Sequence, residues 1–379
     1  MRSTKKDKNM TKILFFIDTL TGGGAEKVLR TLVNNMDPGR FDITVHTLEA
    51  GDPTGLLAPH VRYRAVNRCK TALGKKLFSY WLRLCAQMKW LYPLYIRDDY
   101  DIEVAYLECG PTKILAGSTN RKAKKLAWVH CDMRRKACIA EQTEKLKKYY
   151  EKYHRTVCVA GTVKESYDAL FPGAAESVVL YNVNDEADIL TKAAAFAVPA
   201  MDVPVITAVG RLSDEKGVDR LLAACARLKE AGNRFHLRIV GDGADRQKLE
   251  QMARELGLED VLEFMGFQSN PYPVMAGADV IVCPSRYEGF STVVTEALIL
   301  GKPVVTTPCS GMDELLGDSE FGLITADSTE GIYEGLKTML EDPALRKHYA
   351  EAAAIRGKAF SKEKLVGETE AFFLELLNK

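Results

Sequence analysis

Residues 284–303 decide the fold; they read Pro-Ser-Arg-Tyr-Glu-Gly-Phe-Ser-Thr-Val-Val-Thr-Glu-Ala-Leu-Ile-Leu-Gly-Lys-Pro. A short apolar run, 280–283, precedes them, and a second run rich in β-branched residues, 304–307, follows. Such runs predict buried strands of a parallel sheet, and the residues between them predict a helix. The loop before that helix is therefore expected at the carboxyl end of the sheet, where such folds bind ligands.

This stretch carries two glutamates, Glu288 on the loop and Glu296 on the helix, with seven residues between them. Ser291 or Thr292 can cap the helix and leave its first amides facing an anion. We expect Glu296 in the first helical turn. Taken singly, Glu288 is typical of a solvated loop charge and Glu296 of a residue that complements the helix dipole.

The whole chain alternates strand and helix patterns, which predicts an α/β fold with parallel sheets covered on both faces. The joint is expected in 184–204, where Ala-rich sequence ends in Val-Pro-Ala-Met-Asp-Val-Pro. Two doubly wound, Rossmann-like domains in series follow from this pattern. The predicted strands are 13–17, 43–47, 61–66, 102–107, 126–130, 157–160 and 178–181 in the first half, and 205–209, 236–240, 261–265, 280–283, 304–307 and 323–325 in the second.

Length and composition agree with two domains of a globular protein. The chain has 379 residues, of which 46% are hydrophobic and 27% charged, enough for two independent cores. No apolar run approaches a membrane span, and the basic start of the chain lacks the apolar core of a signal peptide. The nine cysteines show no CxxC spacing. We therefore expect a cytoplasmic protein without a zinc site or a disulfide framework.

The net charge of +1 hides an asymmetry. Residues 1–190 carry 31 Lys and Arg against 22 Asp and Glu, and the remainder carries 21 against 29. Residues 53–97 contain nine basic residues and no acid. Within them, 75–94 predicts an amphipathic helix, which either packs on the core, the interpretation we favour, or rests on an anionic membrane. Its apolar residues are Leu77, Trp81, Leu84, Cys85, Met88 and Leu91; Lys76, Ser79, Arg83 and Gln87 lie on the other side.

The spacing of Glu288 and Glu296, the intervening Gly289-Phe290-Ser291-Thr292 and the flanking strands resemble the donor-sugar signature of family-4 retaining glycosyltransferases, which have the GT-B fold. The resemblance covers 205–342 closely and 12–182 more loosely. It implies two Rossmann-like domains facing across a cleft. The first is an acceptor-side domain of residues 1–183, completed by a C-terminal helix, 362–379, that crosses back. Residues 184–361 form the nucleotide-sugar-binding domain.

The resemblance assigns Arg211 and Lys216, in the loop Gly210-Arg-Leu-Ser-Asp-Glu-Lys-Gly217, to the donor diphosphate. A departing phosphate requires fixed positive charge, which these side chains would supply without a metal. In an unrelated protein they would be a solvated charge cluster. Glu288 is expected beside the donor sugar as a catalytic residue. Further donor contacts are expected from Gly210, Gly241 and Gly243, from Phe267 and Gln268 at the nucleobase, and from Gly289, Phe290, Ser291, Thr292 and Glu296.

The first half carries candidates of its own. Gly23 and Gly24 lie in a glycine-rich loop between a strand and a helix, which is either a close approach to a ligand or a plain tight turn. His130 closes a predicted strand and is expected to contact a sugar hydroxyl, with Asp132 nearby for the acceptor. Asp99 and Asp101 form an Asp-x-Asp, but it precedes its strand, so we expect a solvated turn and no metal site.

Taken together, the sequence predicts a metal-independent, retaining hexosyltransferase that uses a nucleotide-diphosphate sugar, with UDP-sugars favoured and no further cofactor. The loop Cys309-Ser-Gly-Met-Asp-Glu314 resembles bacterial exopolysaccharide and capsule enzymes. It motivates a saccharide acceptor, carried on polyprenyl diphosphate, and contact with the cytoplasmic face of the membrane. Two alternatives stay open: a nucleotide-sugar epimerase on the same fold, and a non-catalytic donor-binding subunit. Nucleic acid is not an expected partner.

Overall fold

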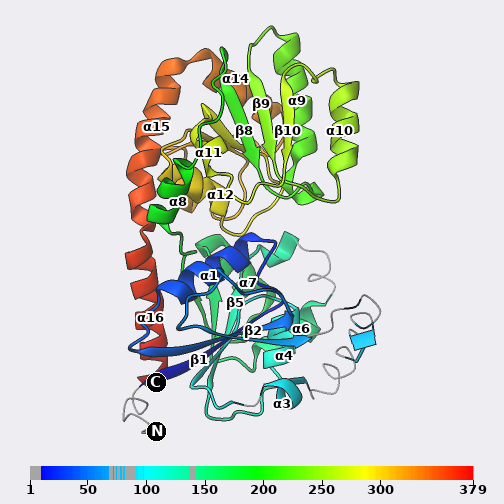
Figure 1. The fold of residues 1–379 in the computed structure, drawn as a ribbon. Helices are drawn as coiled ribbons and strands as arrows, with labels where there is room; N and C mark the ends of the chain where they lie inside the picture. The colour runs from blue at the N-terminus through cyan, green and yellow to red at the C-terminus, as the bar shows by residue number, and fades with distance from the viewer. Residues whose placement is uncertain are drawn as a thin grey trace. The chain divides into compact units, whose positions relative to one another are not determined.

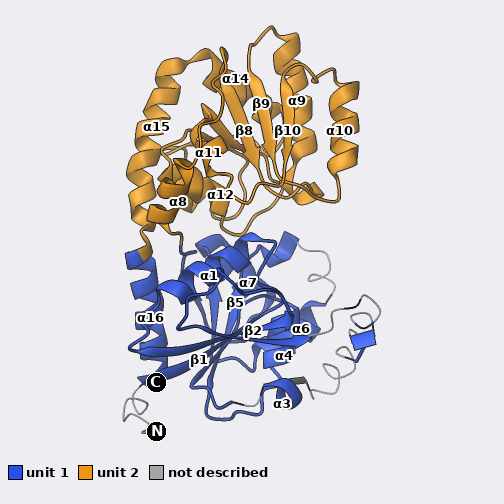
Figure 2. Ribbon diagram, in the orientation of Figure 1, with its two compact units in different colours: residues 1–183, 363–379 blue, residues 184–362 orange. Residues whose placement is uncertain are grey.

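The computed structural model describes residues 10–67, 71, 74, 77, 78, 80, 81, 91–96, 98–135 and 142–378. The chain divides into two compact units. Unit 1 comprises residues 1–183 and 363–379, and unit 2 comprises residues 184–362 (Figure 2).

Unit 1 is built on a seven-stranded parallel sheet in the order β3-β2-β1-β4-β5-β6-β7. The strand order reverses direction between β1 and β4, so consecutive crossovers place helices on both faces of the sheet. The strands are β1 (Thr11–Ile17), β2 (Phe41–Glu49), β3 (Arg62–Asn67), β4 (Ile102–Ala105), β5 (Lys124–Val129), β6 (Arg155–Cys158) and β7 (Ser177–Val179).

The helices of unit 1 include one from the far end of the chain. The ring of Phe373 on α16 packs edge-on against Phe15 of β1, with centroids 6.0 Å apart. Glu370 of the same helix accepts hydrogen bonds from the Asp37 amide and the Arg40 guanidinium. The helices are α1 (Gly24–Asn35), α3 (Leu91–Tyr95), α4 (Gly110–Leu115), α6 (Thr143–Tyr150), α7 (Gly161–Leu170) and α16 (Lys362–Asn378), with a 3-10 turn, η1 (Met133–Arg135) (Figure 1).

Unit 2 repeats the plan with a six-stranded parallel sheet in the order β10-β9-β8-β11-β12-β13. Here the order reverses between β8 and β11. The strands are β8 (Val205–Val209), β9 (His236–Val240), β10 (Leu262–Gly266), β11 (Val280–Cys283), β12 (Val304–Thr306) and β13 (Leu323–Ile324).

The helices of unit 2 bury apolar faces on this sheet. The core joins α9 and α14 to the strands through side chains such as Leu221, Leu228, Ile239 and Leu336. The helices are α8 (Glu186–Ala193), α9 (Val218–Glu230), α10 (Arg246–Glu255), α11 (Tyr272–Ala276), α12 (Thr292–Ile299), α13 (Met312–Leu316), α14 (Thr329–Glu341) and α15 (Pro343–Gly357), with 3-10 turns η2 (Asp214–Lys216) and η3 (Lys358–Phe360).

The chain passes between the units twice, and the two passages are joined by polar contacts. Lys362 Nζ lies 3.0 Å from Asp185 Oδ2, and the Lys362 amide donates to Glu186. Asp185 also caps α8 by accepting from the Asp188 amide. The start of unit 2 and its end are therefore held together.

The predicted fold class is confirmed, because both sheets are parallel and doubly wound. Every predicted strand is present, with ends within two residues of the prediction. The helix predicted over 75–94 lies largely outside the described residues, including Leu84, Cys85 and Met88. At two described positions the core-packing interpretation is wrong, since Leu77 is 63% exposed and Trp81 is 43% exposed.

Candidate active site

A lysine and a glutamate meet at the carboxyl edge of the unit 2 sheet. Lys216 follows β8 and Glu288 follows β11, the two strands between which the strand order reverses. The Lys216 ammonium lies 2.6 Å from Glu288 Oε1, and the Ser285 hydroxyl donates to the same oxygen at 2.7 Å. Such a reversal is where open α/β sheets bind ligands. The arrangement brings together two of the three residues of this unit that were predicted to be catalytic, Lys216 and Glu288; the third is Arg211.

The ion pair is shielded from water, because the Lys216 and Glu288 side chains are 26% and 12% exposed. Burial lowers the pKa of the Lys216 ammonium, but Glu288, together with Cys283 and Glu215, outweighs that effect, and the net shift is upward. Lys216 therefore stays charged across the physiological range.

Arg286 joins the two loops that carry this pair. Its guanidinium donates to both oxygens of Asp219, at 2.8 and 2.6 Å, and to the Asp214 carbonyl at 2.7 Å. Its own amide donates to the Glu215 carbonyl at 2.8 Å. A bidentate arginine–carboxylate pair fixes geometry as well as charge. The loop after β8 and the loop after β11 are thus held in one arrangement.

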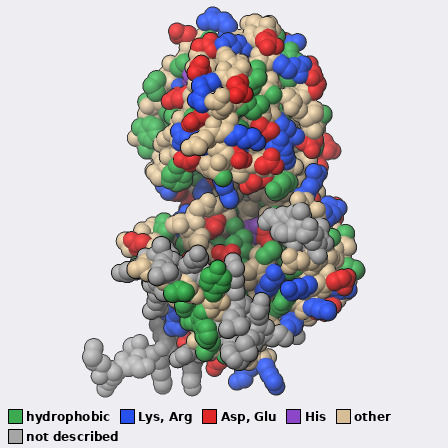
Figure 3. All heavy atoms as spheres, turned by 90° about the vertical axis from the view of Figure 1, so that its right-hand side faces the viewer, with side chains coloured by type: hydrophobic (Ala, Val, Ile, Leu, Met, Phe, Trp, Pro, Cys, Tyr) green, Lys and Arg blue, Asp and Glu red, His purple; other side chains and the backbone are tan. Residues whose placement is uncertain are grey.

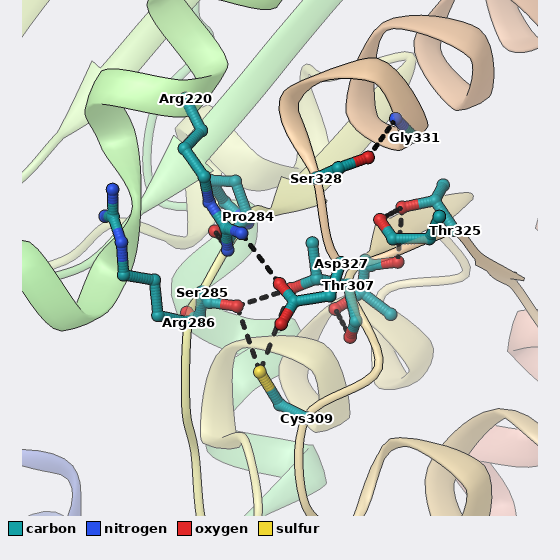
Figure 4. A network of polar contacts seen from close by, with 12 residues as sticks. Arg220, Pro284, Ser285, Arg286, Thr307, Cys309, Thr325, Asp327, Ser328 and Gly331 are labelled. Atoms are coloured by element: carbon teal, nitrogen blue, oxygen red, sulfur yellow. Dashed lines mark hydrogen bonds and ion pairs between the residues drawn. The ribbon is translucent and has the colours of Figure 1, made fainter. Parts of the chain in front are cut away.

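A second network of hydrogen bonds holds the loop that follows β11 (Figure 4). Arg220 donates to the Pro284 carbonyl at 2.8 Å and pairs with Asp327 at 2.7 Å. The Ser285 carbonyl accepts from the Thr307 hydroxyl and the Cys309 thiol. Residues from α9, the loop after β12 and the loop before α14 therefore fix the backbone at 284–285.

Gly217 shows why the loop after β8 needs a glycine. Its φ is 63°, in the left-handed region. A Cβ at this position would lie 2.1 Å from the Pro284 carbonyl oxygen. A side chain here would push the two loops apart.

The predicted glycines at the strand ends serve close backbone packing. A Cβ at Gly241 would lie 1.8 Å from the Gly210 carbonyl oxygen, and one at Gly243 would lie 2.2 Å from that of Leu212. The neighbouring cavity is lined by Gly210, Arg211 and Lys216 among other residues. The Arg211 side chain is exposed and makes no hydrogen bond or ion pair with any residue that the structure describes.

The helix of the two-glutamate stretch, α12, begins after Ser291, whose hydroxyl accepts from the Val294 amide. Glu296 therefore lies in the second turn and not in the first turn as predicted, because the cap sits five residues before it. Its side chain is 4% exposed, and the Tyr272 hydroxyl donates to it at 3.4 Å. Gly289 and Thr292 flank the cap.

Two predicted aromatic contacts differ in their surroundings. The Phe290 ring is buried edge-on against Phe360, with centroids 5.8 Å apart, so it serves packing in this structure. Phe267 is 74% exposed at the end of β10, as a ring that stacks on a ligand must be. Gln268 donates to the Met265 carbonyl and so stiffens that loop.

The carboxyl edge of unit 1 carries acids. Asp18 follows β1, Glu26 lies on α1, and Glu108 precedes α4. Burial raises the pKa of the Asp18 carboxyl to about 6, with further contributions from Glu26 and Glu108. Gly23 caps α1, and a Cβ on it would lie 2.4 Å from a Glu26 oxygen; Gly24 is the first helical residue.

His130 and Asp132 follow β5 at the same edge. The His130 amide and the Cys131 thiol both donate to Glu108, and the His130 ring packs against Tyr106 with centroids 4.8 Å apart. Burial raises the pKa of the Asp132 carboxyl, but hydrogen bonds from Ser166 and Arg134 outweigh it, and the net shift is downward. Asp132 is thus held ionised.

Sequence reasoning missed Ser285, Arg286 and Glu108. Ser285 and Arg286 stood in the opening stretch, but the residues that fix the Ser285 carbonyl are 22 and 24 positions away and the partners of Arg286 are 67 and 72 away, although the contact of the Ser285 hydroxyl with Glu288 spans only three positions. Only that last contact therefore had a local signal. Glu108 follows β4 at the strand-order reversal of unit 1. That position alone could have identified it as a candidate site residue, because such sheets bind ligands there.

In the Asp-x-Asp, Asp99 is exposed, and the Asp101 carboxylate accepts from the Lys12 amide at 2.8 Å. The neighbouring Asp98 pairs with Arg64. Across the described ranges, no group of three or more His, Cys, Asp or Glu side chains is arranged to hold a metal ion. Within the same ranges, no helix has the length and apolar character needed to cross a bilayer.

Comparison with known proteins relates this sequence to glycosyltransferases. Residues 191–356 match the family described as glycosyl transferases group 1. A Campylobacter jejuni N-acetylgalactosamine-N,N'-diacetylbacillosaminyl-diphospho-undecaprenol 4-alpha-N-acetylgalactosaminyltransferase is 39% identical over 52% of this chain and 53% of its own. The lipopolysaccharide core biosynthesis glycosyltransferase LpsE of Rhizobium meliloti is 32% identical over 47% and 51%. The chain thus spans about half the length of these curated relatives.

A solved structure extends the likeness to the whole chain. Anabaena Alr3699/HepE, in complex with UDP and glucose, superposes with a TM-score of 0.75 at 21% identity, covering 96% of this chain and 99% of its own. At this identity the likeness shows the fold. The comparisons support a glycosyltransferase, with the GT-B fold over the whole chain and a glycosyl transferases group 1 domain at residues 191–356.

Proposed function

We propose that this protein is a retaining, metal-independent glycosyltransferase that moves a hexosyl group from a nucleotide-diphosphate sugar to a saccharide acceptor. The observation that carries the proposal is the buried Lys216–Glu288 pair at the strand-order reversal of unit 2. That unit contains the whole of the group 1 match.

In this proposal, Lys216 and Arg211 neutralise the departing diphosphate. The bond between the anomeric carbon and the diphosphate oxygen breaks, so negative charge grows on the oxygen and positive charge on the carbon. Fixed cations stabilise the first, and the Glu288 carboxylate stabilises the second. Arg211 offers an exposed cation, and Lys216 offers a partly buried one beside Glu288.

The remaining candidates take supporting roles. Glu296 binds the ribose hydroxyls, Phe267 and Gln268 meet the nucleobase, and the capped start of α12 faces the donor. On the acceptor side, His130 contacts a sugar hydroxyl and Asp132 orients the acceptor, next to the Gly23-Gly24 loop. The ionised state of Asp132 suits a hydrogen bond from an acceptor hydroxyl.

UDP is the favoured nucleotide, and a polyprenyl-diphosphate-linked saccharide is the favoured acceptor. The Campylobacter relative is named for a diphospho-undecaprenol substrate and an alpha linkage, and the Anabaena structure contains UDP and glucose. On the basis of these names, we propose that the protein acts in the synthesis of a bacterial surface polysaccharide. Retention predicts that an α-linked donor gives an α-linked product.

Two experiments test the proposal. A panel of UDP-, GDP- and ADP-sugars is screened for protection against thermal unfolding, since a bound donor stabilises by mass action. We expect a UDP-sugar to raise Tm most, and no rise with any nucleotide sugar would contradict the donor assignment. The anomeric coupling of the product, measured by NMR, tests retention; a β-glycoside from an α-linked donor would refute it.

A membrane-bound acceptor agrees with the surface of unit 1. Leu77, Tyr80, Trp81 and Leu94 expose apolar or aromatic side chains within a stretch, 53–97, that has nine basic residues and no acid. Figure 3 shows hydrophobic side chains gathered on this unit beside the residues drawn in grey. We propose that this face rests on anionic lipid at the cytoplasmic side of the membrane.

Vesicle binding tests that contact. Binding to anionic vesicles is expected to weaken as salt rises, because the Debye length falls from about 10 Å at 0.1 M to about 3 Å at 1 M. Neutral vesicles serve as the control. Equal binding to both kinds of vesicle, or none to either, would contradict the proposal.

A further inference from the structure

The Ser285 hydroxyl is a buried polar group aimed at the candidate catalytic carboxylate. Ser285 is 1% exposed, and its Oγ donates to Glu288 Oε1 at 2.7 Å. A hydrogen bond to a charged group is about twice as strong as one between neutral groups. This contact therefore restrains the direction in which the carboxylate points.

The two oxygens of Glu288 have different surroundings. Within the described part of the chain, every hydrogen bond that its carboxylate accepts ends on Oε1, from Lys216, from Ser285 and, more weakly at 3.8 Å, from the Cys283 thiol. Oε2 is left for a ligand. Oε1 is thus held by the protein, and Oε2 is available to a ligand.

The two strong donors to Oε1 are not equivalent. Lys216 is a flexible cation that, in the proposed function, is shared with the donor diphosphate. Ser285 is uncharged and lies on backbone fixed by Thr307 and Cys309, which both donate to its carbonyl (Figure 4). When a diphosphate draws Lys216 away, the Ser285 hydroxyl is the strong donor that still holds Oε1.

We propose that Ser285 is a positioning residue that anchors Oε1 of Glu288 and thereby aims Oε2 at the reacting sugar. The inference rests on the proposed function, because Glu288 acts on the sugar only if that function holds. It assigns Ser285 a role in turnover and little role in donor affinity. A serine that merely packs the loop would affect stability and leave turnover unchanged.

Kinetics of Ser285→Ala, alone and combined with Glu288→Gln, test this role. UDP release is followed with whichever of UDP-glucose, UDP-galactose, UDP-N-acetylglucosamine and UDP-N-acetylgalactosamine is turned over fastest. We expect Ser285→Ala to lower kcat about tenfold or more with donor KM nearly held, as loss of a hydrogen bond to a charged group predicts. In the Glu288→Gln background the same change should have almost no further effect, because the two residues act as a unit.

Unit 1 offers a matched control. The Ser177 hydroxyl donates to Asp168 Oδ1 at 2.5 Å, and Ser177 is also buried. Ser177→Ala therefore removes a comparable bond and should leave kcat unchanged in both backgrounds. Thr307→Val is a second probe, since it withdraws a donor from the Ser285 carbonyl; we expect a smaller fall in kcat that also vanishes with Glu288→Gln.

The outcomes separate the inference from the function it rests on. If Glu288→Gln itself keeps wild-type kcat, the proposed role of Glu288 fails. If Glu288→Gln is impaired and Ser285→Ala is not, or if the two losses multiply independently, only the role of Ser285 is overturned. A crystal structure of Ser285→Ala with UDP bound decides without turnover, because the diphosphate then engages Lys216. The Glu288 carboxylate is expected to leave its place or to take several orientations, and an unchanged carboxylate overturns the inference.

Discussion

The two units share a topology and differ in charge at the equivalent edge. In unit 1 the strand order reverses between β1 and β4, and the residues that follow these strands include Asp18 and Glu108. In unit 2 it reverses between β8 and β11, and Arg211 and Lys216 follow the first of these strands. The unit 1 reversal thus carries carboxylates, whereas the unit 2 reversal carries cations interspersed with the acids Asp214, Glu215 and Glu288.

The contrast runs against the overall charge of each half. Residues 1–190 are net basic and residues 191–379 are net acidic, yet the reversal of the first half carries acids and that of the second carries the two cations proposed to bind the diphosphate. A ligand responds to the field of a few nearby, partly buried charges, because exposed charges farther than a Debye length are screened. Net charge of a domain therefore says little about what its site binds.

The largest expected effect comes from Glu288, the one acid at the cationic edge that pairs with Lys216. Glu288→Gln keeps the shape of the side chain and removes its charge, so it should cut kcat by roughly a hundredfold or more, as loss of one preorganised electrostatic group does elsewhere. Steady-state kinetics with varied donor measures it.

The control for that change is an acid from the other edge. Glu108→Gln removes a buried charge that accepts from His130 and Cys131, so it should alter stability while leaving donor KM near wild type. If Glu108→Gln matches Glu288→Gln in kcat and donor KM, the division of labour between the two edges is wrong.

Glu296 is expected to give a smaller effect of a different kind. A contact to the ribose exists before and during the reaction, so its loss raises KM without lowering kcat. We expect Glu296→Gln to raise donor KM, at a cost of about 1–3 kcal/mol for one hydrogen-bonding partner. The same kinetic experiment decides, and a fall in kcat with unchanged KM would transfer the chemical role to Glu296.

Mutation of two aspartates of unit 1 should change the free energy of unfolding in opposite directions. Asp18 has a raised pKa of about 6 from burial and the neighbouring acids, whereas hydrogen bonds hold the pKa of Asp132 below its ordinary value. Asp18→Asn should therefore stabilise the protein above pH 6 by about 1–2 kcal/mol, less than the full shift gives because Asp18 keeps some contact with water. Asp132→Asn should destabilise it at the same pH.

The pH dependence separates the two cases. The folded protein binds a proton on Asp18 more tightly than the unfolded chain does, so stability falls as pH rises from about 4 to about 6. The stabilisation by Asp18→Asn should thus vanish near pH 3.5, where the aspartic acid is protonated and, like asparagine, uncharged. The Asp132 contribution is present above pH 4 and is lost as pH falls through its lowered folded pKa. Urea denaturation at pH 7.5 and pH 3.5 measures both, and equal signs at pH 7.5 would contradict the contrast.

The strands were predictable because their signal is local. Runs such as Ile13–Ile17 and Val280–Cys283 are apolar over their whole length, and a parallel sheet buries both faces of such a run. The position of Lys216 and Glu288 after neighbouring strands followed from the same rule. Their direct contact did not, because it depends on how Arg286 joins two loops that are 67 to 72 positions apart.

The errors also have physical causes. Glu296 was placed one turn too early because Ser291 and Thr292 are equally good caps by sequence, and only the Ser291 bond to Val294 sets the helix start. Leu77 and Trp81 were expected inside because apolar periodicity does not distinguish a core face from a face that meets a lipid or a partner.

The smallest expected effect is that of removing divalent metals, which should leave activity unchanged. In the proposed mechanism Arg211 and Lys216 supply the positive charge that the departing diphosphate needs, and the buried Lys216 is held ionised by Glu288. Excess EDTA should therefore leave kcat and donor KM unchanged. Lys216→Met is the matching control, since a reaction that has lost one of its two cations is expected to gain from added Mg²⁺. If EDTA abolishes wild-type activity and Mn²⁺ or Mg²⁺ restores it, the charge on the diphosphate comes from a metal. The acidic edge of unit 1 would then be the first place to look for its ligands, and the contrast between the two edges would have to be drawn the other way round.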